Sequence, residues 1–137
     1  MALFFGLSVQ ARAAKLDFPA DFVLGGYDVV SYFQESGPVM GTREFTMFYD
    51  GAFYAFRNAE NAEEFRVNTK QYLPAYEANC AFGMVHGMKS SVDPLIWEKV
   101  DGRLFFLINA GTRKRWKKRA PGYIEKSDRV WSKLFEE

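Results

Sequence analysis

Two Asp-Gly dipeptides, Asp50-Gly51 and Asp101-Gly102, constrain the fold of this chain more than any other feature of its sequence. Each dipeptide lies between two short runs rich in aromatic and β-branched residues: EFTMFY and AFYAF around the first, IWEKV and RLFFLI around the second. Asp-Gly supplies the positive φ angles of a type I′ turn, which joins two antiparallel strands. The sequence therefore predicts two hairpins. Both runs of the first are apolar on both faces, so we expect that hairpin to be covered on both sides.

The rest of the chain predicts short helices. They are expected at 29–34 after Asp28, at 59–68 after Asn58, and at 111–119 and 123–133 on either side of Pro121-Gly122. The chain has 137 residues, 48% of them hydrophobic, so it is long and apolar enough to bury a core. The predicted fold class is α+β: an antiparallel sheet built from two Asp-Gly hairpins and packed with several short helices.

Residues 1–13, MALFFGLSVQARA, have the pattern of a secretory signal peptide whose basic start is missing. The mostly apolar run from Ala2 to Val9 is followed by Ala11-Arg12-Ala13, the small-x-small pattern that precedes a signal-peptidase cut. We therefore expect a truncated signal peptide at 1–13, a single domain at 14–137, and a periplasmic or secreted protein. The alternative is an N-terminal tail that frays or packs. The apolar run is far too short to span a bilayer, so no transmembrane segment is predicted.

One segment holds the only cysteine of the chain, Cys80, and its only histidine, His86. It also holds Met84 and Met88, two of the five methionines. The pattern predicts one short helix over residues 76–86. On such a helix Cys80, Met84 and Met88, spaced four apart, share one face, whereas His86 points elsewhere unless the helix frays.

These residue types favour a soft metal ion. Thiolate and thioether groups suit Cu(I), and imidazole also binds copper. The segment therefore predicts a copper site with Cys80 as its anchor, Met84 and Met88 as thioether ligands and His86 as a fourth donor. Zinc fits less well, because one cysteine and one histidine leave half of a tetrahedral shell unfilled.

Two other interpretations of Cys80 stay open at this point. Free cysteine packs as a small hydrophobic residue and methionine fills gaps in cores, so Cys80 and Met84 could be core residues of a ligand-binding or protein-interaction module without a metal. Alternatively, Cys80 and His86 could form the thiolate–imidazolium pair of a thiol-dependent enzyme. The sequence shows no orienting acid or oxyanion loop, so we expect a protein that is not an enzyme.

The ordered landmarks of the chain resemble those of YHS-domain proteins, of the small secreted bacterial type. The landmarks are GYDVVSYF at 26–33, FYAF at 53–56, Cys80-Ala81-Phe82-Gly83, Asp93-Pro94 with Trp97, VDGRL at 100–104, and Pro121-Gly122-Tyr123-Ile124. The resemblance implies a metal-binding function, in a copper or heavy-metal context, with Cys80 as the anchor. Because one chain offers few ligands, a site completed by a protein partner or across a homodimer is a further expectation.

Residues 113–119, RKRWKKR, place six basic residues around Trp116. Such a cluster can bind phosphates or an anionic membrane surface. However, the whole chain has a net charge of +1, which is not the charge of a typical nucleic-acid-binding protein. We therefore expect a solvated helix face with Trp116 packed inward, and no nucleic-acid partner.

Overall fold

The computed structural model describes residues 18–136 and confirms the α+β fold class. The elements in chain order, with η marking a 3-10 helix, are η1 (Val23–Gly26), η2 (Val29–Phe33), β1 (Thr42–Tyr49), β2 (Ala52–Phe56), α2 (Ala59–Val67), α3 (Thr69–Tyr72), η3 (Ala75–Ala78), α4 (Ala81–Met84), β3 (Trp97–Val100), β4 (Arg103–Phe106), α5 (Ala110–Lys117) and α6 (Ala120–Phe135). The predicted signal peptide, residues 1–13, lies outside the described residues. No helix within residues 18–136 has both the length and the apolar character needed to cross a membrane.

Both hairpins form around the Asp-Gly dipeptides. Asp50 and Gly51 have φ angles of +47° and +84°, and Asp101 and Gly102 have φ angles of +51° and +78°, as a type I′ turn requires. β1 pairs with β2, and β3 pairs with β4, both antiparallel. The two hairpins do not pair with each other, so the structure has two separate two-stranded sheets in place of one sheet.

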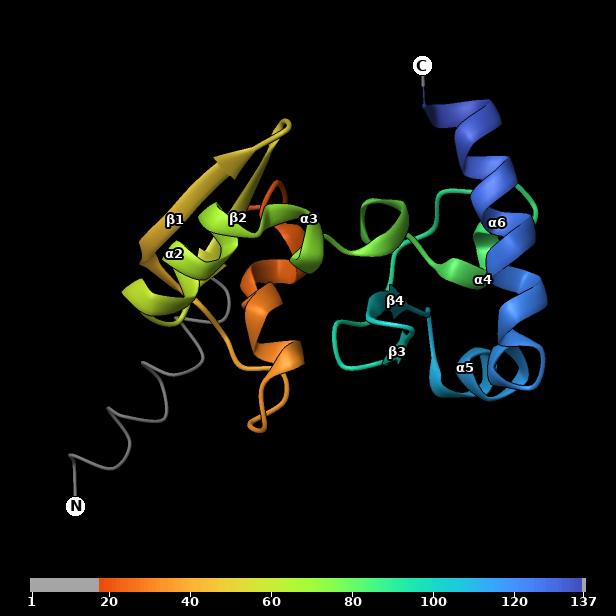
Figure 1. Cartoon of the computed structure of the whole chain (residues 1–137), viewed down its shortest axis with the longest axis horizontal. Coiled ribbons are helices and arrows are strands. Elements are labelled where there is room, and N and C mark those ends of the chain that lie inside the picture. The colour runs from red at the N-terminus through yellow and green to blue at the C-terminus, as the bar shows by residue number, and fades with distance from the viewer. Residues whose placement is uncertain (1–17, 137) are drawn as a thin grey trace.

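The strand β4 lies between two hydrophobic cores. Successive side chains of a strand point to opposite faces, and here both faces are apolar. Leu104 and Phe106 pack into a first core with residues of the N-terminal half of the chain, and Phe105 and Leu107 pack into a second core with residues of the C-terminal half. The elements from η1 to α3 form one group, and the helices α4, α5 and α6 form another. The two groups of elements lie side by side in Figure 1, with β3 and β4 between them.

The prediction that the first hairpin is covered on both sides is wrong. Tyr54, Ala55 and Phe56 of β2 are buried, but β1 is largely exposed, and the ring of Phe48 is 63% exposed. The reason is that α2 and η1 pack against this hairpin, and nothing in the described part of the chain covers the outer face of β1. In the second hairpin, by contrast, both faces of β4 are covered.

The predicted capping residues begin their helices. Asn58 accepts a hydrogen bond from the backbone N–H of Asn61 at 2.8 Å and starts α2. Asp28 starts η2 in the same way. The predicted break at Pro121-Gly122 is wrong: Pro121 lies in the first turn of α6, where a helix does not need its N–H.

Candidate functional site

The predicted single helix over residues 76–86 is wrong. η3 ends at Ala78, Asn79 and Cys80 are extended, and the short helix α4 begins only at Ala81. The backbone N–H of Cys80 donates a hydrogen bond to the carbonyl of Ser90 at 3.0 Å. The helix cannot continue through this segment because the residues before Asn79 have a left-handed backbone.

The four predicted metal ligands lie in two different environments. Cys80 and Met84 are 2% and 0% exposed and pack in the second core. His86 is exposed, and Met88 lies beyond the end of α4 with 58% of its surface exposed. Within residues 18–136, no group of three or more His, Cys, Asp or Glu side chains is placed to hold a metal ion. The structure therefore brings Cys80 and Met84 into one core and leaves the other two at the surface.

Three consecutive residues without a glycine form a left-handed turn in η3. Tyr76, Glu77 and Ala78 have φ angles of +57°, +53° and +63°. This conformation costs an L-residue roughly 1–2 kcal/mol, because its Cβ approaches the following carbonyl oxygen. The phenol of Tyr76 and the side chain of Asn79 hold the turn, the latter by donating to the Tyr76 carbonyl at 3.0 Å. Strain of this kind is commonly maintained at binding sites.

Because the backbone at Ala78 is strained, glycine is expected to stabilise the protein at this position instead of destabilising it. Ala78→Gly is expected to raise the free energy of unfolding by about 0.5–1 kcal/mol, since the relief of a left-handed Cβ exceeds the entropy cost of glycine. The matched control Ala62→Gly, inside α2, is expected to lower it by about 1 kcal/mol. Chemical denaturation of both variants measures the two values. An equal loss in both would show that Ala78 is not strained.

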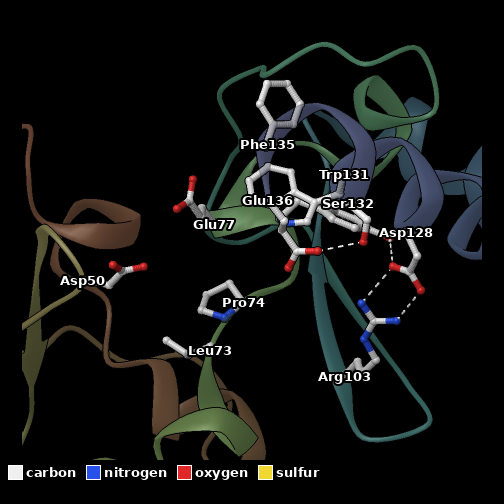
Figure 2. A pocket seen from close by; sticks show the side chains of 11 residues that line it. Asp50, Leu73, Pro74, Glu77, Arg103, Asp128, Trp131, Ser132, Phe135 and Glu136 are labelled. Carbon is white, nitrogen blue, oxygen red and sulfur yellow. Dashed lines mark hydrogen bonds and ion pairs between the residues drawn. The ribbon is translucent and has the colours of Figure 1, made fainter.

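The left-handed turn borders a cleft of about 510 Å³ between the two groups of elements. Figure 2 shows Asp50, at the tip of the first hairpin, on the opposite side of this cleft from the α6 residues. The described residues that line the cleft come from five parts of the chain: Asp50, Leu73, Pro74, Tyr76, Glu77, Arg103, Asp128, Trp131, Ser132, Phe135 and Glu136.

One side of the cleft is lined by an ion pair, Arg103 with Asp128, and by the phenol of Tyr76, which is hydrogen-bonded to Asp128. Arg103 donates from Nη1 and Nη2 to the two carboxylate oxygens of Asp128 at 2.9 and 3.0 Å, and the Tyr76 hydroxyl donates to Asp128 Oδ1 at 2.8 Å. Partial burial acts to raise the pKa of Asp128, but the hydrogen bonds from Arg103 and Tyr76 outweigh it and the pKa is lowered. Burial, followed by the bond to Asp128, raises the pKa of Tyr76 above its ordinary value. Asp128 is therefore an anion and Tyr76 a neutral phenol near neutral pH.

The other charges in the cleft are negative. Asp50, Glu77 and Glu136 line it in addition to Asp128, and Arg103 is the one cation among its described lining residues. Asp128 already neutralises Arg103. A second cavity of about 320 Å³ shares Asp50 and Glu77 with the first, and its described lining contains no cation. The region between the two groups of elements therefore carries an excess of negative charge.

The basic segment is a helix face, as its pattern predicts. Trp116 is fully buried in the second core, while Arg113 and Lys117 form ion pairs with Glu98 at 3.4 and 3.6 Å. The indole N–H of Trp116 has no hydrogen-bond partner among the described residues. This helix contributes packing to the second core and contributes no residue to the cleft.

No family model, curated protein or solved structure matches the chain, so the resemblance to YHS-domain proteins stays a prediction.

Proposed function

We propose that this protein is a non-catalytic binding module whose small-molecule ligand occupies the cleft between the two cores. The observation that carries the proposal is the cleft of about 510 Å³ that is lined by Tyr76 and Glu77, two residues of the strained left-handed turn. Ligand sites in proteins have volumes of about 300–1,000 Å³ and often lie between structural units. A ligand that contacts these residues would account for the retention of a costly backbone conformation.

The side chains of the cleft suit binding better than catalysis. Trp131 and Phe135 supply apolar surface, and the neighbouring carboxylates supply orientation. The described lining residues form no reactive pair: the hydroxyl of Ser132 donates to Glu136 at 2.7 Å, and Asp128 is held by Arg103. A thiol-dependent enzyme needs a thiolate beside a base, whereas Cys80 is buried and His86 is exposed.

Soft-metal binding at Cys80 is the second candidate, and it has less support. The resemblance to YHS-domain proteins favours it, whereas the burial of Cys80 and Met84 in the second core also fits residues that only pack. The exposure of His86 and Met88 leaves the sulfur of Cys80 without these two donors. Reduced protein titrated with Cu(I) against a chromophoric competitor tests this candidate. We expect the same Cu(I) affinity for the wild type and Cys80→Ala; tight binding lost in Cys80→Ala would establish the metal function instead.

A variant that fills the cleft tests the proposed site. Ser132 lines the cleft and is exposed on α6, so Ser132→Trp is expected to block the cleft without disturbing either core. Its neighbour Lys133 is exposed and is not a lining residue, so Lys133→Trp is the matched control. Small molecules from a fragment library would be titrated against the three proteins and followed by amide chemical shifts.

The expected result is a set of fragments that shift the amide signals of Glu77 and Trp131 in the wild type and in Lys133→Trp, but not in Ser132→Trp. Fragments whose binding is unaffected by Ser132→Trp, or a library without any molecule that shifts these signals, would contradict the proposal.

A further inference from the structure

The side chain of Lys89 places an ammonium group at the edge of the cleft. Its Nζ lies 4.6 Å from the ring centre of Phe135 and 5.4 Å from that of Trp131. The same nitrogen lies 3.5 Å from Oε1 of Glu77. An ammonium within about 6 Å of an aromatic ring centre is attracted by the negative face of the ring, and a carboxylate adds to this attraction.

The three side chains that contact Lys89 all line the cleft, whereas Lys89 does not. Phe135 and Trp131 also pack against each other, with ring centres 5.0 Å apart and planes tilted by 44°. Two tilted rings and an adjacent carboxylate form the kind of site that binds organic ammonium ions. Lys89 belongs to a segment without helix or strand, so its long side chain can leave the rings without disturbing the fold.

The charge of the surrounding cleft also favours a cationic ligand. Among the described residues that line the cleft, four are carboxylates, and the one guanidinium is paired with one of them. An anionic ligand would have to approach Asp50, Glu77 and Glu136 without a free cation among the described lining residues. A cationic ligand is favoured beside Asp50 and Glu136, and beside Glu77 once the Lys89 ammonium has left it, and the partly enclosed cleft strengthens the attraction.

We propose that the ligand of the cleft is an organic cation, and that its ammonium group binds to Trp131, Phe135 and Glu77 in place of the Lys89 ammonium. This inference rests on the proposed function of the cleft. Lys89 is then an internal competitor: it occupies the site in the free protein and moves outward when the ligand binds. Loss of its charge favours the ligand, because the competing ammonium is removed.

Choline and its neutral carbon analogue, which has a tert-butyl group in place of trimethylammonium, are the probes. Their shapes match, so a difference in affinity reports the charge. Choline is expected to bind at least about tenfold more tightly, which corresponds to roughly 1.4 kcal/mol. Amide and indole chemical shifts measure both affinities. Equal affinities of the two probes, or binding of neither, would overturn the proposal of a cation site.

Two variants with a matched control test the roles of the residues. Lys89→Met is expected to bind choline about threefold to tenfold more tightly than the wild type. Lys133→Met, which removes an exposed lysine of α6 that does not contact these rings, is expected to bind choline as the wild type does. Phe135→Leu keeps an apolar side chain at an exposed position and is expected to weaken choline binding about threefold. An unchanged or lower affinity in Lys89→Met would contradict the internal competitor.

The outcomes separate this inference from the function on which it rests. Neutral fragments that bind the wild type and fail to bind Ser132→Trp, together with no preference for choline over its carbon analogue, would refute the cation site and retain the binding cleft. Absence of any cleft ligand, charged or neutral, would refute both.

Discussion

Replacement of Asp28 by alanine is expected to lower the free energy of unfolding by about 4 kcal/mol. Asp28 is fully buried, and its Oδ1 accepts from the backbone N–H of Val30 at 2.8 Å. Its Oδ2 accepts from the backbone N–H of Arg57 at 3.0 Å and from the amide of Asn61 at 2.7 Å. Each buried donor that loses its acceptor costs roughly 1–3 kcal/mol, and alanine leaves several of them without a partner. Denaturant unfolding measures the loss.

Two further substitutions at and near this position sharpen the test. Asp28→Asn keeps one carbonyl oxygen, so we expect it to lose about half as much stability as Asp28→Ala. Glu35→Ala removes an exposed carboxylate close by in the sequence and is expected to change the stability by less than about 0.5 kcal/mol. A loss in Asp28→Ala no larger than that in Glu35→Ala would show that Asp28 does not join η2 and α2 to Arg57, the residue that follows β2.

Phe105→Ala and Phe106→Ala are each expected to cost about 3–5 kcal/mol. Both rings are fully buried, and removal of a buried phenylalanine loses its transfer free energy and leaves a cavity. The two side chains point into different cores from adjacent positions of β4. Because the strand is shared, we expect either substitution to lower the protection of amides in both cores. Hydrogen exchange, read residue by residue, measures this coupling.

The control for these two variants is Phe48→Ala, which removes a ring that is 63% exposed and should cost less than about 1 kcal/mol. If Phe105→Ala lowered protection only around Trp116 and left the core around Phe65 unchanged, the two cores would be independent folding units. That outcome would contradict a common structure built on β4.

The parts of the fold that the sequence predicts depend on short-range chemistry. The Asp-Gly turns need only two adjacent residues with positive φ, and the caps at Asp28 and Asn58 need only an oxygen two or three residues before an N–H. The burial of Trp116 follows from its position in a basic helix, where it is the one large apolar residue.

The parts that the sequence does not predict depend on tertiary context. The left-handed backbone at Glu77 and Ala78 has no glycine to indicate it, and it converts an expected helix into two short pieces. Without a continuous helix, the four-residue spacing of Cys80, Met84 and Met88 no longer places their side chains on one face. Similarly, apolar residues on both faces of the first hairpin are typical of strands covered on both sides, and only the packing of other elements decides that one face of β1 is exposed.

The cleft has no sequence pattern of its own. Its residues range from Asp50 to Glu136 and meet only when the first hairpin and α6 lie on opposite sides of the turn at Tyr76. Single residues such as Arg103 and Asp128 are ordinary surface charges when read from the sequence. Their ion pair depends on the topology, which places β4 beside α6 although the two residues are 25 positions apart.

The indole N–H signals of the three tryptophans test the binding cleft most directly. Trp131 lines the cleft, whereas Trp116 packs in the same core as Cys80. In titrations of the full chain with choline, with neutral fragments and with Cu(I), we predict a saturable shift of the Trp131 signal by cleft ligands and an unchanged Trp116 signal in every titration. A saturable shift of Trp116 with Cu(I), and none of Trp131 with any small molecule, would contradict the cleft and place the function at the buried thiol.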